Sequence, residues 1–198
     1  MLGEPFKTEL YESLYSRFCD IGTLEKTFRF AWDASSELGG WCSDRVWRYV
    51  LAEDVLPRIE GSVSRAIGQS LCTKRSAKIE AETSRLREAS ELVMKQKILG
   101  PHAPNQMSPK VLRLCEGLTT YFERPADTKC IVFTRQRHTA RLLGDLFVHL
   151  GIRNLRPGVL IGVRSGDEAG MNTSFRQQFV TLANFRTGEI NCLVWSIY

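Results

Sequence analysis

Three short apolar runs in the last third of the sequence constrain the fold more than any other feature. They read "CIVF" (130–133), "VLIG" (159–162) and "CLVW" (192–195) and lie about thirty residues apart. Helical patterns separate them, one through Ala140, Leu143, Phe147 and Leu150 to Gly151, the other through Phe175, Phe179, Leu182 and Phe185 to Gly188. Strands that are apolar on both faces and alternate with helices predict a parallel sheet with right-handed crossovers.

The first half of the chain has a different pattern. From about residue 6 to 98 it is helix-like, and glycines and a proline divide it into about four helices. Five large apolar residues fall where we expect them to pack between these helices: Trp32, Trp41, Trp47, Val50 and Leu51. Such a stripe is more typical of a core than of a ligand site.

Residues 72–98 predict a long and largely exposed helix with one narrow apolar seam, formed by Ile79, Leu86 and Val93. Arg87–Glu91 and Glu91–Lys95 are expected ion pairs at i,i+4 spacing. The seam either docks on a neighbour or belongs to a solvated bundle helix.

A proline-rich stretch, "GPHAPNQMSPK", predicts a linker. Ser108 and Pro109 then suit the start of a helix. The apolar face of that helix comprises Val111, Leu114, Cys115, Leu118, Tyr121 and Phe122, and Pro125 ends it.

Charge and cysteine usage narrow the class of protein. The excess positive charge lies entirely in residues 101–198, which hold 12 Lys/Arg against 7 Asp/Glu. It indicates either a solvated surface or a face that binds a polyanion. The six cysteines form no C-x-x-C pair, and with only three histidines they predict no metal site. Without a visible signal peptide or membrane span, we expect an intracellular, cytoplasmic chain that contacts no membrane.

Three stretches carry a family resemblance: "KCIVFTRQRHTARLLGDLF", "RPGVLIGVRSGD" and "MNTSFRQQFVTLANFRTGEINCLV". They resemble the second RecA-like domain of the superfamily 2 RNA helicases found in Dicer, in innate immune RNA sensors and especially in fungal Dicer-like proteins. "ELGGWCSDRVW" and "MSPKVLRLCEGL" are similar to that family's helical insertion domain and the helix that returns from it.

The resemblance implies a helical insertion domain (1–100), a linker and returning helix (101–125), and a truncated RecA-like helicase C-terminal domain (126–198). The expected fold class is α-helical plus partial α/β, with an incomplete three-stranded parallel sheet. The motif that should follow the last strand departs from the family at Trp195–Tyr198. We therefore expect the sequence to be a fragment.

The carboxyl ends of parallel strands face the ligand in α/β folds. This places Thr134, Arg135 and Arg137 after the first strand, and Arg164, Ser165 and Gly166 after the second, on one edge of the sheet. The resemblance implies that the same loops contact the RNA backbone, with Asn172 and Gln177 as further candidates. Arginine and hydroxyl groups suit contacts to phosphate and 2′-OH groups of double-stranded RNA.

The parent family hydrolyses ATP with Mg²⁺ and has ribonuclease III-type endonuclease activity, but this chain lacks the expected machinery. No glycine is followed by lysine, so no phosphate-binding loop is present, and no acid pair directly follows an apolar strand. We expect no catalytic residue and no cofactor here.

Three functions remain open from the sequence. The first is a piece of the helicase module of a Dicer-like protein in RNA silencing and antiviral defence, with weak binding to double-stranded RNA and contacts to other helicase domains. The second is a protein-interaction or dominant-negative module. The third is a truncated gene product without activity of its own.

Overall fold

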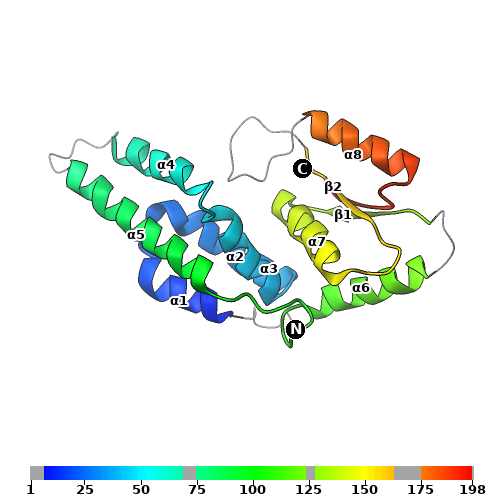
Figure 1. Cartoon of the computed structure of the whole chain (residues 1–198). Helices are drawn as coiled ribbons and strands as arrows, with labels where there is room; N and C mark the ends of the chain where they lie inside the picture. Colours follow the sequence, from blue (N-terminus) through cyan, green and yellow to red (C-terminus); the bar gives the residue numbers. More distant parts are fainter. Residues whose placement is uncertain (1–6, 69–74, 124–127, 163–174, 198) are drawn as a thin grey trace.

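The structure is a computed structural model that describes residues 7–68, 75–123, 128–162 and 175–197. Its first part is helical and its last part contains a small sheet (Figure 1). The helical elements of the first part are α1 (Glu9–Phe18), the 3₁₀ turn η1 (Gly22–Leu24), α2 (Glu25–Glu37), α3 (Gly40–Val50), α4 (Leu56–Gly68) and α5 (Arg75–Lys95). The sequence-based prediction of a helical region followed by a partial α/β region is confirmed.

Aromatic side chains form the centre of the helical part. Trp47 is fully buried, and the ring of Phe28 meets it edge-on at a centroid distance of 4.7 Å. Burial of such rings contributes roughly 2–3 kcal/mol each. Trp41 is buried as predicted, but Trp32 stays 38% exposed and contacts the cluster at its edge, through Tyr11. The prediction of a core position for Trp32 was therefore wrong.

Helix α5 uses its apolar seam within the chain. Leu86 and Val93 are fully buried against the other helices, and Ile79 is half-buried. Ser90, beside the seam, donates its hydroxyl proton to the carbonyl of Leu51 at 2.7 Å. The seam is thus part of the helical core and is not free for a partner.

The ion pairs on α5 follow the prediction in part. Lys95 pairs with Glu91 at 3.0 Å, as the i,i+4 spacing predicts. Arg87 instead reaches across to α4 and meets Glu60 at 2.8 Å. Tertiary proximity offers Arg87 a two-point contact, because its Nη2 also donates to the other oxygen of Glu60.

The proline-rich stretch runs against the turn between α2 and α3. Gly39 in that turn has φ +111°, and a Cβ there would lie 2.5 Å from the carbonyl oxygen of Gln106. The backbones also bond directly, since Ser108 N–H donates to Leu38 O at 2.9 Å and Trp41 N–H to Gln106 O at 3.1 Å. Only glycine fits this left-handed conformation and close approach.

Helix α6 (Pro109–Phe122) begins as predicted. Ser108 Oγ accepts from Val111 N–H at 3.3 Å and donates to Glu37 O at 2.8 Å, so one hydroxyl caps α6 and ties it to α2. Val111, Leu118 and Phe122 are buried. Tyr121, placed on the same face by the sequence pattern, is 40% exposed. Pro125, predicted to end this helix, lies outside the described residues.

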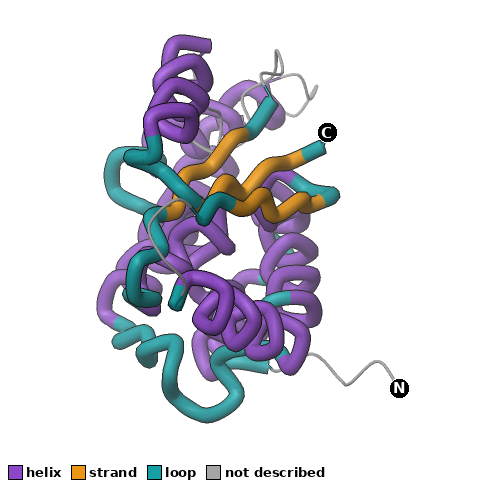
Figure 2. Tube along the Cα trace, turned by 90° about the vertical axis from the view of Figure 1, so that its right-hand side faces the viewer, coloured by secondary structure: helices purple, strands orange, loops and turns teal. Residues whose placement is uncertain are grey.

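The remaining elements are β1 (Cys130–Thr134), α7 (Arg137–Leu150), β2 (Pro157–Leu160), α8 (Phe175–Thr187) and β3 (Cys192–Ser196). The described strands form one parallel sheet in the order β1-β3-β2, and Figure 2 shows them side by side. The first and last strands match the predicted apolar runs, whereas β2 begins two residues earlier than predicted. Helix α7 ends at Gly151, whose φ of +58° is the left-handed conformation favoured by glycine.

The two connecting helices cover opposite faces of the sheet. The path from β1 to β2 crosses β3 in one direction, and the path from β2 to β3 returns in the other. Right-handed crossovers then place α7 and α8 on opposite faces. Figure 1 shows this arrangement, with α8 above the strands and α7 below them.

Helix α8 leaves part of its face of the sheet open. Ile131 and Phe133 of β1 are 41% and 59% exposed, and Trp195 of β3 is 38% exposed. Phe179 of α8 is 67% exposed, whereas Thr181 is buried. The apolar run of β1 is therefore not fully covered, and Phe179, part of the apolar pattern expected for this helix, is left exposed; the side chain of Phe175 lies outside the described residues.

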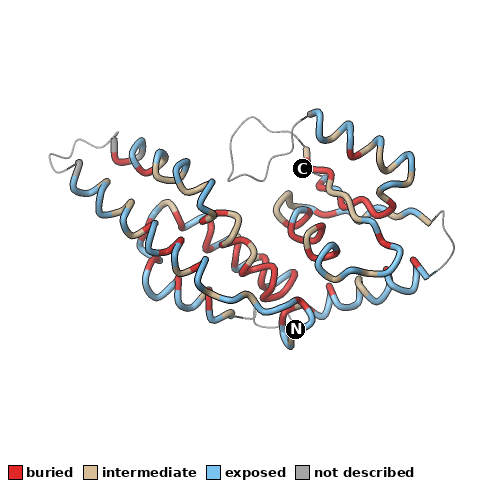
Figure 3. The backbone as a smooth tube through the Cα atoms, viewed as in Figure 1, coloured by how far each residue is buried: buried red, intermediate tan, exposed pale blue. Residues whose placement is uncertain are grey.

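Helix α3 joins the helical part to the sheet by packing on α7. The ring of Trp41 lies 4.9 Å from that of His149, and the guanidinium of Arg141 lies 5.9 Å from the centre of the Tyr49 ring. Buried residues concentrate along this contact and in the sheet, as Figure 3 shows. The predicted domain boundaries stay a prediction. In the described ranges, we find no helix with the length and apolarity that a membrane crossing requires.

Candidate nucleic-acid interface

The carboxyl ends of β1 and β3 lie side by side. Thr134 pairs in register with Ser196, and the N–H of Ile197 donates to Thr134 O at 3.0 Å. β2 ends beside them, since Leu160 pairs with Trp195. The parallel topology therefore brings the chain after β1 and the end of β3 to one edge of the sheet.

Thr134 fixes the turn that leaves β1. Its side chain is buried, and Oγ1 lies 3.2 Å from the carbonyl oxygen of Gln136 and 3.4 Å from that of Trp195. The hydroxyl proton is shared between these two acceptors. Thr134 thus positions the backbone of the turn from which Arg135 and Arg137 extend.

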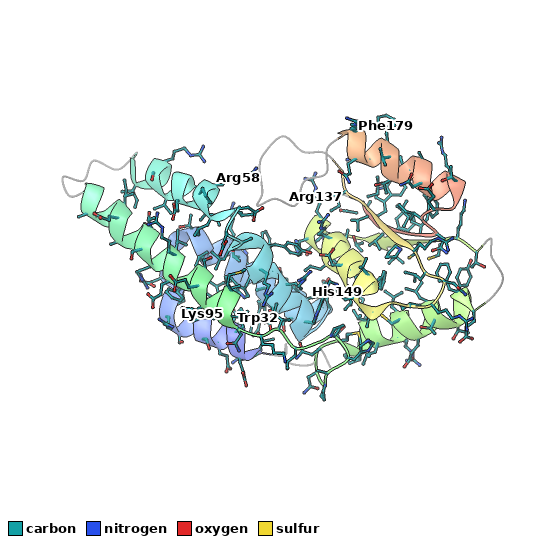
Figure 4. All side chains as sticks on the ribbon, in the orientation of Figure 1. Trp32, Arg58, Lys95, Arg137, His149 and Phe179 are labelled. Atoms are coloured by element: carbon teal, nitrogen blue, oxygen red, sulfur yellow. The ribbon has the colours of Figure 1, made fainter. Side chains whose placement is uncertain are left out.

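Arg135 and Arg137 flank the start of α7. Arg135 is exposed in the bend after β1, and Arg137 is the first residue of the helix and half-buried. Figure 4 shows Arg137 at the end of α7 next to the strand ends. Gln136 precedes the helix in an extended conformation, and within the described ranges no side chain caps the first turn. The N–H groups of that turn add positive potential to the two guanidinium groups.

The helical part supports this end of α7. The ring of His138 packs against that of Phe30 from α2, with 4.9 Å between centroids. His138 lies in the first turn, as predicted, but it is half-buried by this contact. The orientation of the first turn, and of Arg137 within it, therefore depends on α2.

The other predicted residues divide into two groups. Arg164, Ser165, Gly166 and Asn172 lie outside the described residues. Gln177 is exposed on the first turn of α8. The next residue, Gln178, was not predicted, yet its side-chain amide donates to Ile161 O directly after β2. It anchors α8 to the strand end, and the pair "QQ" in the sequence gives no signal to choose between the two glutamines.

Comparison with known proteins identifies relatives of this chain. It is 55% identical over 192 residues to Dicer-like protein 1 of Aspergillus niger, and 54% identical over 192 residues to that of Aspergillus oryzae. Dicer-like protein 1 of Phaeosphaeria nodorum is 36% identical over 195 residues. Each alignment covers 97% of this chain. This chain is homologous to one segment of the Dicer-like proteins. No protein-family model matches it.

The similarity to Dicer-like proteins runs through both the helical part and the sheet. It covers only 12–13% of the relatives' own length. This chain therefore corresponds to one short segment of each of these relatives.

The arginines of this Dicer-like segment do not form one cluster. Arg156, at the start of β2, donates to Gly188 O at 2.9 Å and to Glu189 O at 3.1 Å, and so holds the turn after α8. Arg141 faces the Tyr49 ring and lies 3.9 Å from Asp145. Arg135 and Arg137, unlike Arg141 and Arg156, lie at the carboxyl end of a strand. Over the same described ranges, no cluster of three or more His, Cys, Asp or Glu residues suits a metal ion.

Proposed function

We propose that this chain is a portion of the helicase module of a Dicer-like ribonuclease, comprising the helical insertion and part of the second RecA-like domain. The homology to Dicer-like protein 1 supports the proposal that the parent protein is Dicer-like. The strand–helix alternation and the sheet order support an α/β domain of the RecA-like kind. RNA silencing and antiviral defence are the role that we propose for the parent.

The strand-end edge is the proposed contact with double-stranded RNA. The observation that carries this proposal is the position of Arg135, in the bend between β1 and α7, and of Arg137, the first residue of α7. Guanidinium groups and helix N–H groups bind phosphate without reading sequence. Two such side chains give weak binding, because each phosphate contact contributes only one released counterion.

Filter binding with a blunt double-stranded RNA of about 20 base pairs, titrated from roughly 50 to 200 mM salt, tests the proposal. We expect affinity to fall with a negative slope in log–log form. Double-stranded DNA of the same length is the competitor, because A-form shape and 2′-OH groups distinguish RNA. An affinity that does not respond to salt, or the absence of binding at the lowest salt concentration, contradicts the proposal.

A second candidate function is contact with other segments of the helicase module. It rests on the open sheet face, where Ile131, Phe133 and Trp195 are exposed and the rings of Phe133 and Trp195 lie 5.8 Å apart. Parallel sheets ordinarily have both faces covered. Hydrogen exchange of β1 in this chain and in a longer Dicer-like protein tests it: protection of β1 that is equal in both contradicts a covering segment.

A further inference from the structure

Cys130 and Cys192 are neighbours at the start of their strands. They are the first residues of β1 and β3, and they pair in register across the parallel ladder. Paired residues of adjacent strands point to the same face. Cys192 is fully buried and Cys130 is half-buried, so both thiols lie on the covered face of the sheet and one of them is within reach of solvent.

The two thiols differ in acidity. The hydrogen bond with Cys192 lowers the pKa of Cys130 below its ordinary value, because the partner thiol stabilises the thiolate. The same hydrogen bond, together with burial, raises the pKa of Cys192. Burial raises the pKa of Cys115 to about 11 and also raises that of Cys42. Of these four cysteines, Cys130 is therefore the one whose surroundings favour a thiolate.

We propose that Cys130 and Cys192 form a reversible oxidation site for peroxides. The Cys130 thiolate attacks a peroxide oxygen, the O–O bond breaks, and Cys130 becomes a sulfenic acid while hydroxide leaves. The Cys192 sulfur then attacks the Cys130 sulfur, its proton leaves with the departing hydroxyl as water, and a disulfide forms. In total two thiols lose two hydrogen atoms and one hydrogen peroxide becomes two waters.

The register of the two strands allows this bond. Adjacent strands lie about 4.8 Å apart, which is inside the range of about 4.4–6.8 Å between the Cα atoms of a disulfide. The site lies at the amino ends of the strands, opposite the edge proposed for RNA.

Peptide mapping of the full 198-residue chain under non-reducing conditions tests the site. Trypsin releases Cys130 in "CIVFTR" (130–135) and Cys192 in "TGEINCLVWSIY" (187–198). After a limiting dose of hydrogen peroxide we expect these two peptides linked, two hydrogens lighter than their sum, and separated again by dithiothreitol. Oxidation of Cys130 should be at least about tenfold faster than that of Cys115.

Two variants sharpen the result. In Cys192→Ser the sulfenic acid on Cys130 has no resolving thiol, so we expect it to be trapped by dimedone. Cys19→Ser, which removes an exposed cysteine at the end of α1, should leave the link unchanged. If Cys192→Ser does not fold, the wild-type map still decides. A peroxide dose that oxidises half of Cys19 without any 130–192 link overturns the proposal.

Discussion

Thr8 donates its hydroxyl proton to Oδ1 of Asp44 at 2.5 Å and so joins the start of α1 to the middle of α3. The same Oγ1 accepts from Tyr11 N–H at 3.1 Å and caps α1. Asp44 is buried, and burial raises its pKa to about 6, although the Thr8 hydrogen bond and nearby Arg48 act in the opposite direction. The surroundings of the Asp44 carboxyl group therefore favour its neutral, protonated form.

The first prediction follows from the sign of this shift. The folded state binds the Asp44 proton more tightly than the unfolded state, whose pKa is near 3.8. Asp44 thus favours folding most at low pH, and this contribution is lost as pH rises from about 4 through 6. Asp44→Asn keeps an acceptor for Thr8 without the charge. We expect it to raise the free energy of unfolding above pH 6 by about 1–3 kcal/mol.

Urea denaturation of both proteins at pH 4.5 and pH 7.5 measures this difference. The matched control is Asp20→Asn, which removes a surface carboxylate whose pKa is lowered by its hydrogen bond to Arg85. It should not reproduce the gain at pH 7.5. An Asp44→Asn protein that is less stable at pH 7.5 would show that attraction to Arg48 outweighs the cost of burial.

The second prediction concerns the seam of α5. Leu86→Ala removes a fully buried side chain and should lower the free energy of unfolding by about 2–5 kcal/mol. Met94→Ala on the same helix is the control, because Met94 is 47% exposed and its loss should cost well under about 1 kcal/mol. Equal effects in a urea titration would mean that the seam is not part of the core.

Sequence patterns predict the helices and strands of this fold better than they predict which side chains those elements bury. The apolar runs at β1 and β3, the Ser108 cap and the Gly151 end were all predictable, because each depends on chemistry within a few residues. The exposure of Trp32 and Phe179 was not predictable. Helical spacing tells which side chains share a face, but not how far a neighbouring element extends over that face.

The candidate site shows the same limit. The strand–helix alternation in the sequence implies a parallel topology, and that topology is enough to place Arg135 and Arg137 at the strand ends. It does not reveal that the hydroxyl of Thr134 is engaged by two carbonyls. Nor does a count of arginines show that Arg156 holds the turn after α8. Such roles depend on contacts between residues far apart in the sequence.

The third prediction tests the proposed interface directly. Replacing Arg135 and Arg137 together by alanine should weaken binding to double-stranded RNA about tenfold or more at roughly 50 mM salt and reduce the salt slope by about 2. The control replaces Arg113 and Arg153, which are exposed on α6 and after α7, and so removes the same charge elsewhere. If the two double variants lose affinity equally, net charge and not the strand-end edge governs binding.

The last prediction concerns ATP. Phosphoryl transfer needs stabilisation of the charge on the transferring group, which ATP-hydrolysing enzymes provide with a phosphate loop, Mg²⁺ and arginines. None of the 198 residues is a lysine that follows glycine, so the loop is missing from this sequence. We expect phosphate release at background level in the presence of saturating double-stranded RNA. RNA-stimulated release that Arg135→Ala abolishes would show instead that this edge belongs to a nucleotide site.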